Sequence, residues 1–476
     1  MPTFKRESKP LLYRLIRVVM KVAMAVFFQK IELRRGEYVP DVGPVVFVAN
    51  HPNSIMDAFV MGVVTKRKVN YVGHAGLFRG KLKAWFLRSC GVIPVYRRED
   101  APDKMEQNVS AFEACYQALE KGETIGIFPE GTSDMLRVVK RVKTGAARIV
   151  LEAERRNGYQ LGVKLIPIGL YFFSRTRFRS KVLVNVGKPI DLEPFFEINE
   201  RDNYEAVRRL TEEIQRRLEK LTVSVSAEEL DQFVRDVESI YRDELKQETL
   251  AGRKDVSSTE ADFIVTKQIA DCVGYYFQRE PQRVRALQAR IQAYKRKLSR
   301  LRLRDAMLKE PQGLWPLFWK NLLSLTRVIV GLPLAAYGLV NNLLPYLITE
   351  QLAKRFVDER TKILTALLLG GAATFLAFYS TQTAVVWHFK GVGWAVLYAM
   401  SLPLSGLFTL SYLKETQAEK QRISLALFFL TKRQLLDRIQ RERRQLIEEL
   451  NRIKEEYMCL QGWSPEPKSS NQVAER

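Results

Sequence analysis

The stretch from about Val328 to Leu413 is largely uncharged, whereas charged residues dominate most of the rest of this 476-residue chain. It holds three apolar segments, Val328–Thr349, Ile363–Trp387 and Gly391–Leu413. Each segment is about long enough to cross roughly 30 Å of hydrocarbon as a helix. The sequence therefore predicts a membrane protein, with the second and third segments as transmembrane helices.

The first apolar segment, 328–349, leaves two alternatives, re-entrant or spanning. It contains Pro333, Pro345 and the pair Asn341 and Asn342, which are costly against lipid unless protein or water satisfies their polar groups. Basic residues crowd both before this segment and after Leu413, and the positive-inside rule assigns both crowded ends to the cytoplasm. A hairpin of two spans, with the first segment not crossing, satisfies that rule. We therefore expect an integral membrane protein with its N-terminal domain on the cytoplasmic face.

A separate apolar run, Leu11–Phe28, begins the chain. Its basic residues Arg14, Arg17 and Lys21 fall on one side of a helix. This pattern predicts, within residues 1–30, an amphipathic helix at the membrane interface with a basic stripe toward lipid headgroups. The alternative is an ordinary amphipathic helix packed on the adjacent domain.

Residues 31–222 alternate between β-rich and helical patterns. Short apolar strands separated by helices are typical of an α/β domain, here a mixed sheet covered by helices on both faces. The predicted strands are Val45–Ala49, Val69–Gly73, Val92–Tyr96, Thr124–Phe128, Lys164–Tyr171 and Val182–Val186.

The regions that flank the apolar stretch are polar and helical. Residues 223–312 end in a basic helix with an apolar stripe, which could dock on anionic lipid, on nucleic acid or on another helix. Lipid is favoured over nucleic acid because the helix precedes a membrane region and no nucleic-acid-binding motif accompanies it. Residues 414–462 predict a charged packing or coiled-coil helix, and residues 463–476 a disordered tail.

The composition indicates which partners and which kinds of site the chain can have. The chain has 76 Lys and Arg against 53 Asp and Glu, a formal net charge of +23, so it attracts anionic partners. Its four cysteines lie far apart and it has three histidines, which argues against a disulfide framework or a metal centre. We expect no metal and no cofactor.

His51 and Asp57 are the first candidates for catalysis. His51 comes after the strand VVFVAN, and Asp57 lies near the start of the next helix. A carboxylate at this position can accept the Nδ1–H of the imidazole and leave Nε2 as a base for a hydroxyl. The alternative is a loop histidine near an aspartate that caps a helix.

Candidate binding residues follow two further strands. Arg97 comes after the strand GVIPV, and Glu130 and Gly131 come after another. In open α/β sheets, ligands bind at the carboxyl ends of strands, so these residues should meet His51 at one crevice. Arg97 offers a planar fork to a phosphate, and Gly131 lets backbone N–H groups approach an anion. Lys143 is a second candidate for phosphate binding, although a merely solvated lysine fits it as well.

Four blocks now stand in order: NHPNSIMDAF, GVIPVYR, IFPEGTSD and LIPIGL. Together they resemble the glycerolphosphate and lysophospholipid acyltransferases, over about residues 31–194. The resemblance implies a catalytic dyad of His51 and Asp57 and an acyl-donor pocket shaped by Pro167. It also implies that the acceptor is bound by Arg97, Glu130, Gly131 and Thr132.

The spacing within the first block departs from the family's common pattern. Five residues separate His51 from Asp57, where four are usual. The longer form resembles a subgroup that includes the fungal acyltransferases of glycerol-3-phosphate and dihydroxyacetone phosphate. The loop from His51 to Ser54 can absorb the extra residue.

The resemblance implies a membrane-bound O-acyltransferase of phospholipid synthesis. It would move a fatty acyl group from acyl-CoA or acyl carrier protein to glycerol-3-phosphate or dihydroxyacetone phosphate. Lysophosphatidate or another lysophospholipid is the alternative acceptor, and an inactive lipid-binding scaffold is the alternative outside catalysis. FPEGTSD contains no G-x-S-x-G elbow, so we expect direct transfer without an acyl-enzyme. Expected partners are membrane lipids, the phosphate acceptor and the acyl donor, and no nucleic acid.

Overall fold

A computed structural model describes residues 4, 11–96, 106, 108–134, 136–225, 228–253, 255–301, 303, 305–308, 314–356, 359–431 and 433–460. Two predictions lie outside these residues: the position of Arg97 and the state of the tail, 463–476. The chain divides into two compact units. The sheet unit comprises Met1–Ser226 and Gly338–Leu404, and the helical unit comprises Ala227–Tyr337 and Ser405–Arg476.

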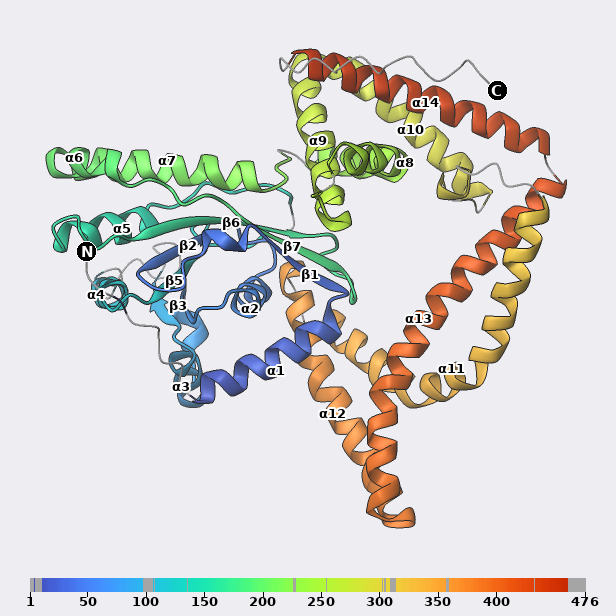
Figure 1. The fold of residues 1–476 in the computed structure, drawn as a ribbon, viewed down its shortest axis with the longest axis horizontal. Coiled ribbons are helices and arrows are strands. Elements are labelled where there is room, and N and C mark those ends of the chain that lie inside the picture. Colours follow the sequence, from blue (N-terminus) through green and yellow to red (C-terminus); the bar gives the residue numbers. More distant parts are fainter. Residues whose placement is uncertain are drawn as a thin grey trace. The chain divides into compact units, whose positions relative to one another are not determined.

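The sheet unit is built on a seven-stranded mixed sheet, which confirms the predicted α/β class (Figure 1). Its strand order is β1-β7-β6-β2-β5-β3-β4, and all neighbours are parallel except β6 and β7. The strands are β1 Lys30–Arg34, β2 Val45–Ala49, β3 Val69–His74, β4 Ile93–Val95, β5 Thr124–Ile127, β6 Lys164–Phe172 and β7 Lys181–Val186.

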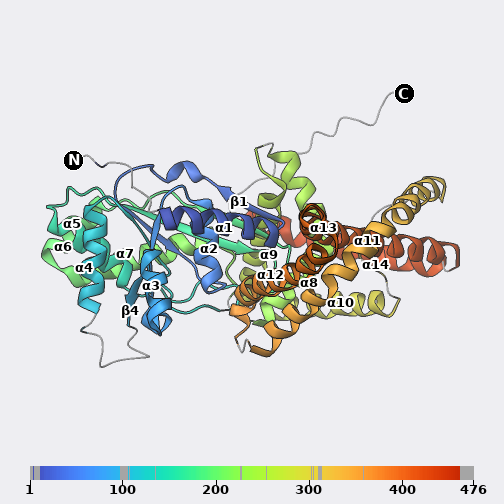
Figure 2. The same ribbon diagram turned by 90° about the horizontal axis from the view of Figure 1, so that it is seen from below.

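Helices cover both faces of this sheet. They are α1 Leu11–Phe27, α2 Ile55–Val64, α3 Lys81–Ser89, α4 Asn108–Glu120, α5 Gly145–Arg156, α6 Glu193–Arg201 and α7 Asn203–Leu221, with short 3-10 helices η1 Gly36–Tyr38 and η2 Ala75–Phe78. Strand β2 is buried at all five positions, because its side chains alternate between two cores. Val46 and Val48 pack with α4, α5 and α7, whereas Val45, Phe47 and Ala49 face α1 and α2. Figure 2 shows α1 beside α2 from a second direction.

Helix α1 packs on the domain through Tyr13, Met24 and Phe27, and its exposed face is mainly apolar, at Leu11, Leu15, Val18, Val19, Val22 and Val26. The expected basic stripe is split. Arg14 and Lys21 are exposed, but the guanidinium of Arg17 donates to the carbonyl oxygens of Thr65 and Lys66. These carbonyls lie at the end of α2, where a helix leaves backbone acceptors without partners of its own.

Three helices are long and apolar enough to cross a membrane, by length and composition: Val328–Arg355, Ile363–Lys390 and Val392–Gln417. They belong to α11 Leu314–Phe356, α12 Ile363–Lys390 and α13 Val392–Thr431, and η5 Arg360–Lys362 precedes α12. Helix α11 is continuous, so no re-entrant loop interrupts it. The pair Asn341 and Asn342 is satisfied by protein, because Asn341 accepts from the Tyr398 hydroxyl and Asn342 from the Tyr379 hydroxyl, each at 2.6 Å.

The first residues of α12 join the core of the sheet unit. Leu364 is fully buried and Leu368 is 6% exposed, in the same cluster as Met24 and Phe28. One core of the sheet is thus completed by residues more than 300 positions away in the chain.

The helical unit contains α8 Glu228–Gly252, α9 Ser258–Arg279, α10 Pro281–Arg300, η4 Asp305–Leu308 and α14 Arg433–Leu460. The apolar stripe of α10, Val284, Leu287, Ile291, Tyr294 and Leu298, is buried. Its cations pair with carboxylates of neighbouring helices, such as Lys297 with Glu442 at 2.8 Å. The apolar stripe therefore docks on other helices, which was one of the three alternatives that the sequence left open. Helix α14 packs in the same unit.

Candidate active site

Two neighbouring strand ends bring His51 and Glu130 together. Strands β2 and β5 are parallel, with Val48 opposite Ile127, so the loops after them leave the same edge of the sheet. The backbone N–H of His51 donates to Oε1 of Glu130 at 2.9 Å. The histidine loop is therefore tied to the glutamate loop directly.

His51 and Asp57 form the contact that a catalytic dyad requires. Nδ1 of His51 lies 2.9 Å from Oδ2 of Asp57, and the same oxygen accepts the backbone N–H of Asn53 at 2.8 Å. The ring of His51 stacks on Phe128 at 4.3 Å between centroids. With the proton on Nδ1, this arrangement fixes the ring and leaves Nε2 as the basic atom.

The loop between His51 and α2 contains a residue with unusual backbone geometry. Ser54 has a φ of 52°, in the left-handed region that residues other than glycine seldom adopt. Helix α2 then begins at Ile55 and carries Asp57 in its first turn. The longer spacing thus leaves the imidazole and the carboxylate in hydrogen-bonding contact.

Burial raises the pKa of Asp57 above its ordinary value of 3.8. The side chain is fully buried, and desolvation of the charged form is the largest cause. The hydrogen bond and charge of His51, the N–H of Asn53 and the charge of Arg175 act in the opposite direction. The carboxylate therefore depends on these contacts to stay ionised.

Glu130 braces the loops. Its Oε1 accepts the N–H of His51, and its Oε2 accepts the N–H of Lys140 at 3.1 Å. The residue is 5% exposed, and desolvation raises the pKa of its carboxyl group. Both oxygens are occupied by backbone donors, so its geometry fits a positioning residue better than the acceptor-binding role that was expected.

The glycine of the same loop makes room for a lysine. Gly131 has a φ of 74°, and a Cβ added there would lie 3.2 Å from Cε and Nζ of Lys143. Its own N–H donates to the carbonyl oxygen of Phe128 at 3.1 Å. Thr132 comes next, with its hydroxyl 3.3 Å from Nζ of Lys140.

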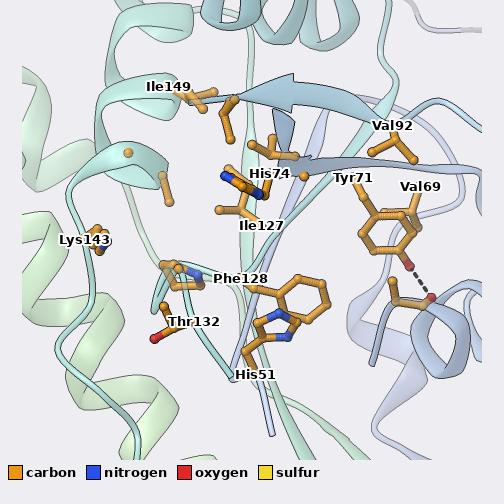
Figure 3. A pocket seen from close by; sticks show the side chains of 18 of the residues that line it. His51, Val69, Tyr71, His74, Val92, Ile127, Phe128, Thr132, Lys143 and Ile149 are labelled. Carbon is orange, nitrogen blue, oxygen red and sulfur yellow. Dashed lines mark hydrogen bonds between the residues drawn. The ribbon is translucent and has the colours of Figure 1, made fainter. Parts of the chain in front are cut away.

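The sheet unit has a cleft of about 2170 Å³ beside these loops. His51, Thr132 and Lys143 all contribute to it, and Figure 3 shows Thr132 and Lys143 on one side of His51 and Tyr71 on the other. One wall is apolar, with Phe128, Tyr71 and Phe59, and the lining also includes the cations Arg141 and Arg148. The cleft offers a base, an apolar surface and positive charge, as a reaction between an acyl chain and an anionic acceptor would require.

Residues 30–171 match the model of the Acyltransferase family. The sheet unit thus contains an acyltransferase domain of this family.

Proteins similar to this chain are named for two different acceptors. The glycerol-3-phosphate O-acyltransferase 1 of Saccharomyces cerevisiae is 25% identical over 54% of this chain and 32% of its own length. The 1-acyl-sn-glycerol-3-phosphate acyltransferase of Streptococcus pneumoniae is 26% identical over 36% of this chain and 59% of its own. The crystal structure of the 1-acyl-sn-glycerophosphate acyltransferase PlsC from Thermotoga maritima aligns with a TM-score of 0.34 and 21% identity, over 44% of this chain and 79% of that one.

The chain spans about a third of the yeast relative's length. The matched stretch of 262 residues is longer than the acyltransferase domain alone.

One expected site residue lies elsewhere in the acyltransferase domain. Pro167 is buried within β6 and packs against Gly187. Strand β6 lies on the far side of β2 from β5 and β3, which contribute to the cleft, and Pro167 is not part of the lining. The expected role of Pro167 in the acyl-donor pocket is therefore not supported by this cleft.

The sequence analysis missed three residues that position the groups of the candidate active site. They are Phe128, which stacks on His51; Asn53, which binds Asp57 through its N–H; and Lys140, which binds Glu130 in the same way. Phe128 precedes Pro129 in the FPEGT block, so a signal for it existed. The other two act through backbone atoms, which side-chain patterns do not report.

Among the described residues, no group of three or more His, Cys, Asp and Glu is placed to hold a metal ion.

Proposed function

We propose that this chain transfers a fatty acyl group from acyl-CoA or acyl carrier protein to the hydroxyl of glycerol-3-phosphate, with dihydroxyacetone phosphate as a second acceptor. The product would be lysophosphatidate or its dihydroxyacetone analogue. The observation that carries the proposal is the 2.9 Å contact between Nδ1 of His51 and Oδ2 of Asp57, at the edge of a cleft with both apolar and cationic walls.

In this proposal Nε2 of His51 takes the proton of the attacking hydroxyl as the new C–O bond forms at the thioester carbonyl. Asp57 stabilises the imidazolium. The C–S bond then breaks, and the imidazolium returns its proton to the departing thiolate. General-base catalysis of this kind contributes roughly 10²–10⁴-fold, so orientation of both substrates must supply the rest.

The cations of the cleft support an anionic acceptor. Lys143 lies against Gly131, in the loop between β5 and α5, and it lines the same cleft as His51. Arg141 and Arg148 add charge that would attract a phosphate monoester and the phosphates of coenzyme A. Thr132 offers a hydroxyl for a hydrogen bond to the acceptor.

Lysophosphatidate is the second candidate acceptor. The Streptococcus pneumoniae relative is named for that step, and a cleft of about 2170 Å³ has room for an acceptor that already bears one acyl chain. The product would then be phosphatidate.

The test uses the full chain in nanodiscs with radiolabelled glycerol-3-phosphate, dihydroxyacetone phosphate and lysophosphatidate in parallel, each with acyl-CoA and with acyl carrier protein. His51→Ala should lose acylation by roughly 10²–10⁴-fold. His388→Ala is the matched control, because His388 lies at the end of α12 outside the cleft lining. Full activity of His51→Ala would overturn the mechanism, and acylation of lysophosphatidate alone would select the second candidate.

A further inference from the structure

The helical unit contains a second cavity, of about 500 Å³. It lies among α8, α9, α10 and α14, and all its lining residues belong to this one unit. The buried apolar members of the lining are Phe233, Val237, Leu245, Ile269, Val273, Val284, Leu287, Leu450 and Ile453.

This cavity is partly open to solvent, so a ligand can reach it from outside. A cavity of this size falls within the roughly 300–1,000 Å³ of small-molecule sites. Two lining tyrosines turn their hydroxyls toward partners, Tyr241 to Asn451 and Tyr276 to Glu456 at 3.4 Å. The interior therefore offers mainly apolar surface, which suits a hydrocarbon chain.

The rim of the cavity is cationic. Arg253, Arg283 and Lys454 line it, against a single carboxylate, Glu248. Lys454 is paired with Glu248 at 2.8 Å, and Arg283 with Glu456 at 2.8 Å. Arg253 is exposed. Within the part of the chain that the structure describes, its guanidinium makes no hydrogen bond or ion pair to a side chain. An anionic group at the mouth would thus find an unneutralised cation.

We propose that this cavity binds a lipid with one acyl chain and an anionic headgroup, such as lysophosphatidate. The chain would occupy the apolar interior, and the headgroup would meet Arg253. Because the cavity shares no lining residue with the cleft that holds His51, this binding does not depend on acyl transfer.

The experiment uses the full chain in nanodiscs and a lysophosphatidate whose acyl chain carries a photoreactive diazirine. The label is mapped to peptides by mass spectrometry, in the parent protein and in His51→Ala, which removes turnover. We expect labelled peptides from α8, α9 or α14 in both proteins. Unlabelled lysophosphatidate should compete, whereas the two-chain phosphatidate and the uncharged monoacylglycerol should compete weakly.

Two variants test the two halves of the site. Val273→Phe fills the cavity and should abolish labelling there, whereas Ala289→Phe, at an exposed position of α10 outside the lining, should not. Arg253→Glu should weaken binding roughly two- to fivefold, the effect of losing one exposed ion pair. Arg285→Glu, exposed on α10 and outside the lining, is its control. Thermal unfolding of each variant identifies any that fail to fold.

Three results would overturn the proposal: labelling confined to α11, α12 and α13, labelling unchanged in Val273→Phe, or equal competition by phosphatidate. Labelling that appears only after residues 461–476 are removed would show that the chain's own end fills the cavity, and would overturn it as well.

Discussion

Asp57 combines complete burial with a charge that the proposed mechanism needs. Its pKa is raised by burial, so the ionised form is less favourable in the folded protein than in the unfolded chain. For a carboxyl group with a raised pKa, the contribution to stability is fully present below the ordinary value of 3.8. It is lost as pH rises through the folded value. At neutral pH the ionised, buried carboxylate of Asp57 therefore lowers the stability of the folded protein.

Asp57→Asn should therefore separate activity from stability. Its acyl transfer should fall by roughly 10²–10⁴-fold, because the amide cannot stabilise the imidazolium. Its melting temperature, relative to that of the parent protein, should rise as pH is raised from 4 to 8. Thermal unfolding across that range measures the difference. If the melting temperature of the variant fell relative to that of the parent protein as pH rises, burial would not be the main influence on the pKa of this carboxyl group.

Glu130→Gln tests whether the Glu130 carboxylate positions the His51 loop. A glutamine offers one acceptor and one donor where two backbone N–H groups, of His51 and Lys140, need acceptors. We expect kcat to fall about tenfold or more with a smaller change in KM, because one misaligned hydrogen bond at the site moves the base. Initial-rate kinetics with varied acceptor separate the two constants.

The matched control is Glu154→Gln. Glu154 is 1% exposed and also accepts two backbone N–H groups, but from Leu161 and Val163, and it makes no bond to the backbone of His51. It should lose stability and keep its kcat. If Glu130→Gln raised KM alone, the residue would belong to acceptor binding after all.

The residues of the site were predictable in part. His51 and Asp57 were paired from their positions after a strand and at the start of a helix, and the structure brings them into contact. The orientation of Glu130 was not predictable, because a sequence does not show which backbone N–H groups a buried carboxylate will meet. The role of Pro167 in an acyl-donor pocket stays a prediction, because Pro167 lies in β6 and outside the lining of this cleft.

At the level of elements, six of the seven strands were found from their runs of apolar residues. Strand β1 was missed because KIELR is short and half polar, as suits an edge strand whose partner, β7, lies about 150 residues later. The helix over residues 11–27 was expected, yet the inward position of Arg17 was not. Helical spacing gives the face on which a residue lies, but not which face meets the domain.

Arg17→Gln should destabilise the contact between α1 and α2. The guanidinium binds two carbonyl oxygens at the end of α2, the helix that also carries Asp57. We expect a loss of about 1 kcal/mol in the free energy of unfolding, the net contribution of a typical intramolecular hydrogen bond. Lys21→Gln, at an exposed position of the same helix, should have little effect. Equal melting temperatures for the two variants would remove Arg17 from this role.

At the scale of the whole molecule, the open question from the sequence is how many helices cross the bilayer. If α11, α12 and α13 all cross, the α/β domain and α14 lie on opposite sides. If only α12 and α13 cross, both lie on the same side, which the crowding of basic residues at both ends favours.

Two cysteines can distinguish these topologies. Cys459 is exposed on α14, and Glu197→Cys places a second thiol at an exposed position of α6, 75% accessible in the parent side chain. With the other cysteines replaced by serine, a membrane-impermeant maleimide should label both thiols from the same side of sealed vesicles. Labelling of one thiol only after the vesicles are opened would establish three crossings.

The burial of Leu364 and Leu368 could not have been predicted. Within an apolar stretch of this length, a leucine that faces lipid and one that enters a protein core look alike. Only the fold shows that these two complete the cluster around Met24 and Phe28.

That cluster also sets an order of events during synthesis. Strands β1 to β7 leave the ribosome long before Leu364 does, so one face of the sheet must wait for about 180 residues with part of its apolar surface uncovered. Helix α1 is available earlier and can shield some of it. Final closure of this face is therefore coupled to insertion of α12, and a ribosome that stalls before α12 would leave a sheet in need of a chaperone or of the bilayer itself.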